Sequence, residues 1–309
     1  MTGKIVILGV FVADTAYRAD RMPRIGETIL GNSFKLGPGG KGSNQSVAAA
    51  RAGGTVHFIS KLGRDPFADM ALDTWKEAGV IPEVAQSDES YTGAAYIFIE
   101  EGTGDNAIII SPGIAGSITA DYVAAQAGLI GGASVFMTQL EQPMEAAVRG
   151  LELARAAGVT TVLNPAPAAE LPDGMLGLCD YVTPNESETE ALTGRPVSGL
   201  DEARAAAEGL MSRGAGAAII TLGENGALYH DGRRSEHVPA FRAGDVVETT
   251  GAGDAFNGAF ATALAEGRDP VEAVRFGCAC AAISVTRPGT APSMPRRSEI
   301  EALLAGGVG

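Results

Sequence analysis

The sequence predicts an α/β protein with three layers, in which a mainly parallel β-sheet lies between two layers of helices. Short apolar runs alternate with amphipathic segments along most of the 309 residues, which is the order that βα units produce. Hydrophobic residues make up 45% of the chain but aromatic residues only 6%, so small side chains allow close helix–sheet packing. We expect a single domain over residues 1–309 with a small β-sheet attached.

The predicted strands are short apolar runs, most of them containing β-branched residues. In chain order they are residues 5–8, 56–60, 135–138, 161–164, 181–183, 218–222 and 246–249. The predicted helices are longer, and their apolar residues recur every three or four positions. They are residues 43–51, 67–78, 120–127, 143–157, 186–192, 201–213, 255–266, 270–285 and 297–304. Because the two kinds of element alternate, most neighbouring strands are expected to run parallel.

Two segments outside this alternation predict the small sheet. Residues 94–111 have the pattern of a hairpin, with apolar runs on both sides of a turn rich in glycine, Asp and Asn, and residues 28–36 have an extended pattern. We expect a lid formed by segments 11–38 and 91–112 that closes over a site and excludes water. The alternative is an edge hairpin without function. The apolar run 108–110 indicates that this hairpin covers something or pairs with a second subunit.

Charge and composition exclude several classes of partner. A formal net charge of -14 argues against nucleic acid or an anionic membrane as the main partner, and no apolar run is long enough to span a bilayer. The chain begins with an apolar run, but charged residues follow it at once and no small-residue cleavage site is evident, so a first strand is favoured over a signal peptide. The odd, sparse set of Cys179, Cys278 and Cys280 favours a reducing cytoplasm and core positions over metal binding.

The most informative segment is 249–256, with the sequence TTGAGDAF. Val246 and Val247 predict a strand before it, and a helix-forming stretch follows, so two glycines stand at a strand-to-helix turn. The free N–H groups of a first helical turn, together with its partial positive charge, form a site for an anion such as a phosphoryl group. Asp254 beside this site is placed to take a proton from an attacking hydroxyl. The alternative is an ordinary Asp N-cap.

A second glycine cluster, 37–44, precedes the first long helix. It is not a P-loop, because Gly42 follows Lys41 and Lys occupies position 35. It matches G-x-G-x-x-G, but it does not follow the first strand directly, which makes a nicotinamide oxidoreductase the weaker interpretation. Glycines let a small ligand approach the backbone, and Lys41 and Asn44 offer the donors and acceptors that a polyol needs. The alternative is a turn with a solvated lysine.

Polar residues follow the carboxyl ends of most predicted strands. Ligands bind beyond these ends in open parallel sheets, so we expect the residues to meet at one rim. They are Asp14, Glu141, Asn164, Asn185 with Glu186 and Glu188, Thr221 with Gly223, and residues 249–254.

With these motifs in this order, the chain resembles the ribokinase-like sugar kinases, the PfkB carbohydrate kinase family. The matching segments extend over nearly the whole chain. They are residues 39–45, 92–93, 139–141, 163–167, 183–186, 221–223, 251–254 and 285–289. The resemblance implies ATP and Mg²⁺ as cofactors, transfer of the γ-phosphoryl group to a hydroxyl of a pentose-like sugar, and a homodimer formed through the lid. Kinases for a ketohexose, a nucleoside or a phosphosugar stay open, as does a non-catalytic sugar or nucleotide sensor.

The resemblance also implies a role for each matching position. Asp254 would be the catalytic base, and the amides of Gly251, Ala252 and Gly253 would form an anion hole. The sugar-binding residues would be Asp14, Gly40, Lys41, Asn44 and Glu141. The nucleotide would lie along Asn185, Thr221, Gly223 and Gly226, and Asn185 and Glu188 would hold Mg²⁺ through water. Structural alternatives are a helix cap for Asn185 and the start of a helix for Glu141.

Two positions depart from the family pattern. Val12 stands where these kinases usually carry Asn. Because the Val side chain cannot hydrogen-bond, the preferred sugar is expected to lack a hydroxyl there or to present it elsewhere, and a 2-deoxypentose or a different pentose or ketose would fit. Glu248 stands where members activated by K⁺ carry Asp, which predicts a weaker or altered K⁺ dependence. The other cation-site positions are present: Thr250, Ser284, Arg287, Gly289 and Ser293.

Overall fold

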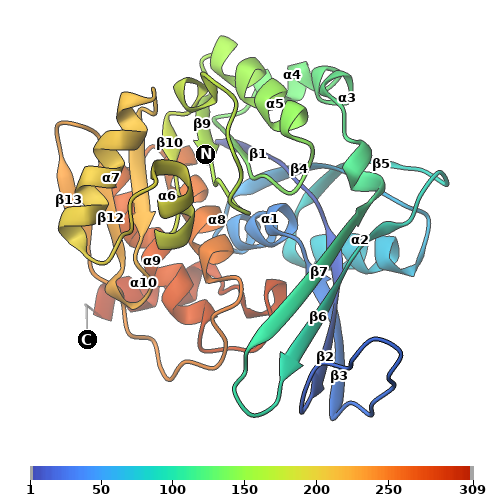
Figure 1. Ribbon diagram of the computed structural model, residues 1–309. Coiled ribbons are helices and arrows are strands. Elements are labelled where there is room, and N and C mark those ends of the chain that lie inside the picture. The colour runs from blue at the N-terminus through green and yellow to red at the C-terminus, as the bar shows by residue number, and fades with distance from the viewer. Residues whose placement is uncertain (1–2, 307–309) are drawn as a thin grey trace.

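The computed structural model describes residues 3–306, and its centre is a nine-stranded sheet in the order β13-β12-β11-β10-β9-β8-β1-β4-β5 (Figure 1). The strands are β1 Lys4–Leu8, β4 Thr55–Leu62, β5 Ile81–Gln86, β8 Val135–Thr138, β9 Thr160–Leu163, β10 Tyr181–Val182, β11 Ala217–Thr221, β12 Ala227–His230 and β13 Ser235–Val238. Only the pairs β11–β12 and β12–β13 of this sheet are antiparallel. The mainly parallel sheet is therefore confirmed.

Helices cover both faces of the sheet. They are α1 Lys41–Arg51, α2 Pro66–Ala78, α3 Ala120–Ala124, α4 Ala127–Gly131, α5 Met144–Ala156, α6 Glu186–Thr193, α7 Leu200–Ser212, α8 Ala252–Ala265, α9 Pro270–Ser284 and α10 Arg297–Gly306. Successive residues of a strand point to opposite faces. Accordingly, Ile5 and Ile7 of β1 pack in one core with α1, α2, α8, α9 and α10, and Val6 and Leu8 pack in a second core with α3, α4, α5 and α7. These two cores confirm the three layers.

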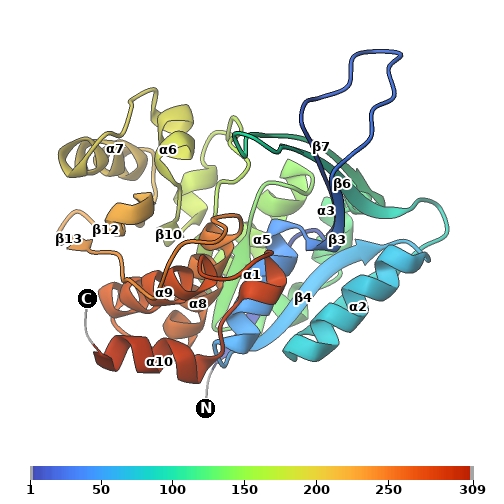
Figure 2. The same cartoon turned by 90° about the horizontal axis from the view of Figure 1, so that it is seen from below.

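A separate four-stranded sheet projects from this body (Figures 1 and 2). Its strands are β2 Val12–Ala19, β3 Ser33–Gly39, β6 Thr92–Glu100 and β7 Asn106–Gly113, in the order β3-β2-β6-β7. The β6–β7 pair is the predicted antiparallel hairpin. Strand β2 runs parallel to β6 and antiparallel to β3. The second, smaller sheet is therefore confirmed.

The predicted strand 246–249 is wrong. Val246 and Val247 lie in a loop with exposed fractions of 65% and 60%, and the N–H groups of Val247 and Glu248 donate to the carbonyl of Val285 at 2.8 and 3.1 Å. The antiparallel hairpin β12–β13 forms the edge of the sheet beside β11. Periodicity missed that hairpin because its strands are short and β13 is mostly polar, and it missed β5 because Pro82 and Glu83 interrupt the apolar pattern.

Helices α1 and α8 pack closely at Gly258, which has no side chain. A Cβ atom at Gly258 would lie 2.4 Å from the carbonyl oxygen of Gln45 and 2.6 Å from the Cβ of Ala48. One turn further on, the hydroxyl of Thr262 donates to the carbonyl of Ala49 at 3.1 Å. This contact determines how near the first turns of the two helices lie.

We predict that Gly258→Ala lowers the free energy of unfolding by about 1–3 kcal/mol, because the added methyl group forces the two helices apart. Urea denaturation measures the change. Gly209→Ala in α7 is the matched control, since a Cβ there meets nothing within 4 Å. The control should gain about 0.5–1 kcal/mol from helix propensity. Equal effects of the two substitutions would contradict the close-packing interpretation.

Candidate active site

The turn before α8 leaves the start of the helix without a side-chain cap from the described residues, although the N–H of Ala252 is bonded within the turn. Gly251 is the N-cap at φ 84° and ψ 0°, a left-handed conformation that favours glycine, and no side chain within the described part of the chain caps the helix there. A Cβ at Gly253 would meet nothing within 4 Å, so space is open beside this turn. The N–H of Ala252 donates to the carbonyl of Thr249 at 3.1 Å. The geometry is that of an anion site at a helix N-terminus.

Asp254 lies inside the first turn of α8, and it is not the N-cap, because Gly251 holds that position. Its exposed fraction is 7%, and both carboxylate oxygens accept amide hydrogen bonds. Asn44 Nδ2 donates to Oδ2 at 3.0 Å, and Gln45 Nε2 donates to Oδ1 at 3.1 Å. Burial raises the pKa of Asp254, while the charge of Lys41 and the two amides partly oppose the rise. The result is an oriented, buried carboxylate at the open turn.

The start of α1 contributes a closely packed glycine, Gly40, and a lysine, Lys41, to the region around Asp254. Gly40 has φ 88°, and a Cβ there would lie 2.6 Å from the carbonyl oxygen of Val10, so only glycine fits. The N–H of Lys41 donates to Glu141 Oε2 at 2.7 Å. Burial opposes the charge of the Lys41 ammonium, but Asp254 and Glu141 raise its pKa.

Two further carboxyl groups face this lysine and Asp254. Asp14 extends from β2 over the Cα of Gly39, and burial, followed by the charges of Asp254 and Glu248, raises its pKa to about 7. Burial also raises the pKa of Glu141 to about 7, although Lys41 opposes the change. Carboxyl groups and an ammonium around one space are suited to the hydroxyls of a polyol.

A small cavity of about 140 Å³ extends from Lys41 and Asp254 to the opposite side of the rim, and neither Asp14 nor Glu141 lines it. Lys41 and Asp254 line it together with Asn185, Glu188 and Thr221. Asn185 caps α6, since its Oδ1 accepts from the N–H of Glu188 at 2.8 Å while Glu188 Oε2 accepts from the N–H of Asn185 at 2.9 Å. The capping alternative for Asn185 is thus confirmed, and the capping box also presents the buried Glu188 to the cavity.

A larger groove of about 700 Å³ continues from this cavity and shares Asn185, Thr221 and Gly253 with it. Gly223 and Gly226, which were expected to lie along the nucleotide, both line this groove, and both have positive φ. Its apolar wall comes from Phe256 and α9, and its rim from residues 240–246, which sequence analysis missed. No periodic signal marks an irregular loop, and the small residues of α9 have the pattern of core packing.

The predicted cation-site residues form a loop that is tied together by its own hydrogen bonds. Glu248 Oε2 accepts from the N–H of Gly289 at 2.8 Å. The hydroxyls of Ser284 and Ser293 donate to carbonyls three residues earlier, and Arg287 pairs with Glu299. Thr250 lies at the exposed end of the segment. The side chain of Glu248, which is one methylene longer than that of Asp, therefore bonds directly to the backbone at Gly289.

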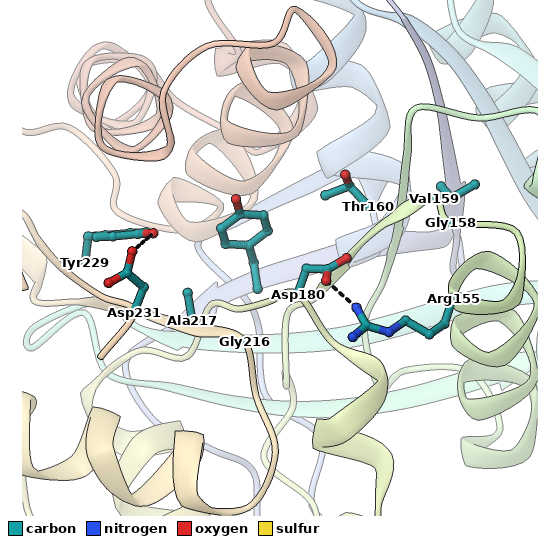
Figure 3. A pocket seen from close by; sticks show the side chains of 10 residues that line it. Arg155, Gly158, Val159, Thr160, Asp180, Gly216, Ala217, Tyr229 and Asp231 are labelled. Carbon is teal, nitrogen blue, oxygen red and sulfur yellow. Dashed lines mark hydrogen bonds and ion pairs between the residues drawn. The ribbon is translucent and has the colours of Figure 1, made fainter. Parts of the chain in front are cut away.

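A further cavity, of about 660 Å³, lies away from the predicted site, at the amino ends of β9, β10 and β11 on the opposite edge of the sheet (Figure 3). Arg155 pairs with Asp180 across its floor, and Tyr229 Oη donates to Asp231 at 2.9 Å. None of the predicted site residues lines it. The three cysteines are buried and free, and residues 3–306 hold no group of three His, Cys, Asp or Glu side chains arranged for a metal.

Comparison with known proteins decides the family. The model of the pfkB family carbohydrate kinases matches residues 2–297. The chain belongs to this family. Ribokinase of Haemophilus influenzae is 36% identical over 300 residues, covering 97% of both chains, and deoxyribokinase of Salmonella typhimurium is 36% identical over 303 residues, covering 97% of this chain and 98% of the relative. Arabidopsis thaliana ribokinase, solved with ribose and ATP, superposes with a TM-score of 0.92 at 29% identity, covering 98% of this chain and 99% of that chain.

This PfkB protein is an ATP-dependent sugar kinase with the ribokinase-like fold. The nicotinamide oxidoreductase and the non-catalytic sensor are therefore set aside. Within residues 3–306, no helix combines the length and the apolar character that crossing a membrane requires.

We predict that Asp14→Asn stabilises the ligand-free kinase at pH 8 but not at pH 4.5. Because the folded-state pKa of Asp14 is raised to about 7, the native protein holds this proton more tightly than the unfolded chain, so its free energy of unfolding falls as pH rises from about 4 to about 7. The variant avoids this loss, which is on the order of 2–4 kcal/mol. Urea denaturation at both pH values measures it.

The control for charge removal is Asp73→Asn on the exposed face of α2. A stability difference between Asp14→Asn and the parent that is the same at pH 4.5 and pH 8 would show that Asp14 does not titrate in this range.

Proposed function

We propose that this kinase phosphorylates a pentose or a closely related sugar, with Asp254 as the base. The observation that carries the proposal is the position of Asp254, a buried carboxylate in the first turn of α8 that lines the small cavity next to the long groove. The sugar hydroxyl would give its proton to Asp254 as its oxygen bonds to the γ-phosphorus of ATP, and the β–γ bridging oxygen would leave with ADP.

The sugar would lie between β2 and the start of α1. We assign its hydroxyls to Asp14, Gly40, Lys41, Asn44 and Glu141. Asn44 Oδ1 supports this assignment, because it is buried and finds no hydrogen-bond partner among the described residues. A hydroxyl donating to this oxygen would satisfy it.

The nucleotide would occupy the large groove, with its phosphates directed at the turn before α8. We assign contacts with it to Asn185, Thr221, Gly223 and Gly226, and contacts with the transferred group to the amides of Gly251, Ala252 and Gly253. Mg²⁺ would be held through water by Asn185 and Glu188; the buried carboxylate of Glu188 on the shared cavity fits a hard cation. When bound, the ion neutralises phosphate charge.

We further propose that segments 11–38 and 91–112 act as a lid and as the contact of a homodimer in the cytoplasm, with residues 1–309 forming one domain. Support for the dimer comes from apolar side chains that the small sheet leaves exposed. Among them, Phe34 has an exposed fraction of 56% and Ile109 of 69%. A sheet edge of this kind is usually covered.

The decisive experiment is Asp254→Asn. We expect kcat to fall by about 10²–10⁴, because the amide cannot accept the proton, while the KM for ATP changes little. A coupled assay of ADP release measures both. Asp69→Asn, which removes a first-turn carboxylate from the exposed start of α2, is the matched control and should keep the parent's kcat. Unchanged turnover by Asp254→Asn would refute the proposal.

The identity of the sugar depends on Val12. Its side chain is 3% exposed, and it lies two residues before Asp14 in β2, on the same face of the strand. A hydroxyl buried against Val12 would stay unpaired, which favours a 2-deoxypentose over ribose. A ribokinase and a deoxyribokinase are equally similar to this chain at 36% identity, so similarity does not separate them. Ketohexose, nucleoside and phosphosugar substrates remain alternatives.

We predict that the parent has a higher kcat/KM for 2-deoxyribose than for ribose, and that Val12→Asn shifts the ratio toward ribose by about 5- to 100-fold, which corresponds to one buried hydrogen bond. Val12→Ala is the control, because it makes room without adding a hydrogen-bonding group. A large preference of the parent for ribose, or equal shifts in the two variants, would contradict the role of Val12.

We also propose that Glu248 weakens the response to K⁺. Its bond to the N–H of Gly289 supports this, because the carboxylate thereby closes the loop without a cation. Activity of the parent should differ little between K⁺ and Na⁺, whereas Glu248→Asp, which is one methylene shorter, should become activated by K⁺. Initial rates in matched chloride salts provide the test. Strong K⁺ activation of the parent would disprove it.

A further inference from the structure

A chain of buried amides leads from the end of β8 to Asp254. Gln139 Nε2 donates to Gln45 Oε1 at 2.5 Å, and Gln45 Nε2 donates to Asp254 Oδ1 at 3.1 Å. The second hydrogen of Gln45 Nε2 goes to Asn164 Oδ1 at 3.0 Å. Gln45 and Gln139 both have exposed fractions of 0%. Each polar atom of the Gln45 amide therefore has a hydrogen-bond partner within the protein.

The direction of every bond in this chain is determined by its ends. Asn164 Nδ2 donates to the carbonyl of Thr183 at 2.9 Å, so the oxygen of Asn164 must face Gln45. An ionised Asp254 only accepts, so Gln45 must present its NH₂ group to both of these partners and its carbonyl to Gln139. The amide of Gln45 can bond to all three partners in one orientation only.

From this arrangement we infer that Gln45 is a positioning residue for Asp254 and that Gln139 holds Gln45 in place. This inference rests on the proposed role of Asp254 as the base. Gln45 lines neither cavity of the site, so it acts through the carboxylate and not on the sugar or ATP. Asn44 holds the other oxygen, so the two adjacent residues of α1 together stop the carboxylate from rotating.

A purely packing role does not account for this chain. Gln139 Oε1 is buried and has no partner among the described residues, which is an unfavourable arrangement that an apolar side chain would avoid. Glycines make room for it: a Cβ at Gly9 or Gly42 would lie 2.5 or 2.9 Å from this oxygen. The fold thus accommodates an unpaired acceptor, and the other end of the same amide orients Gln45.

Removing the hydrogen-bond donor of Gln45 shifts the pKa of Asp254 in a definite direction. The hydrogen bond from Gln45 favours the ionised form of Asp254 and lowers its pKa against the larger effect of burial. The charged or titratable groups that influence Asp254 are Lys41 on α1, Asp14 on β2, Glu141 after β8 and Glu188 on α6. All of them remain when Gln45 is replaced, so the loss of the donor raises the pKa of Asp254.

The test is Gln45→Met, which keeps the length of the side chain without its donor. The rate of phosphoryl transfer is measured in single turnovers with ribose and with 2-deoxyribose as a function of pH. A single turnover reports the transfer step itself, because product release does not limit it. We expect the rate to fall about 10- to 100-fold, somewhat less than for the loss of a direct catalytic donor. The acidic limb of the profile should move up by about one pH unit, and the KM for the sugar should stay unchanged. Gln139→Met should move the same limb in the same direction.

Gln142→Met is the matched control. Gln142 is also buried, close in sequence and without a partner for its Oε1 among the described residues. Its amide donates to Thr138 Oγ1 and to the backbone carbonyl of Gln139, and not to the side chains that lead to Asp254. The control should leave the pH profile unmoved. An equal rate loss and an equal profile shift in Gln142→Met would overturn the inference, because general loosening of the fold would explain all three variants.

Asp254→Asn in the same assay separates the two claims. If it is inactive while Gln45→Met and Gln139→Met keep the parent's rate and profile, the positioning role is wrong and the role of Asp254 stands. If Asp254→Asn retains the parent's rate, the proposed function itself fails. Thermal unfolding checks that each variant is folded, and if Gln45→Met does not fold, the profile of Gln139→Met decides.

Discussion

The site depends on the close approach of α1 and α8 at Gly258. Without a side chain at this position, the backbone of α1 lies near enough for Asn44 and Gln45 to reach the carboxylate of Asp254 on α8. The two helices are more than 200 residues apart in the chain, as the sequence separation of 210 for the Asn44–Asp254 bond shows. A wider spacing would leave a buried carboxylate without donors, which is among the costliest defects in a protein interior.

Charge around this carboxylate is balanced only in part. Lys41 is one ammonium among the carboxyl groups of Asp14, Glu141 and Asp254, and burial raises the pKa of each of these acids. A carboxyl group with a pKa of about 7 exists at neutral pH in both protonation states, so it can donate to or accept from a hydroxyl. Crowding of buried carboxyl groups around one ammonium is electrostatically unfavourable, and hydrogen bonds to hydroxyl groups would offset this cost.

Sequence patterns predicted the layers of this fold because strands buried on both faces produce continuous apolar runs and covering helices produce a 3.6-residue period. They were less informative where tertiary pairing decides the structure, as in the short hairpin β12–β13 and in the loop at Val246. The glycine motifs located Lys41, Asn44 and Asp254 because chemistry at a helix start leaves a local signature. Gln45 and Gln139 stand in segments that match the family, but no local pattern indicates their role, since only the folded chain reveals which acceptor a buried amide faces.

The loop after α9 shows how distant parts of the site are joined mechanically. Arg51 Nη1 donates to the carbonyls of Ala291, Pro292 and Met294, and Thr290 Oγ1 donates to the carbonyl of Pro38 at the end of β3. One residue before Thr290, the N–H of Gly289 donates to Glu248 Oε2, and Glu248 lies just before the turn at Gly251. A displacement of β3 therefore has to be taken up by the segment that presents the amides of α8. The position of the small sheet and the geometry of the turn before α8 are linked through one short loop, because these bonds leave it little freedom to deform alone.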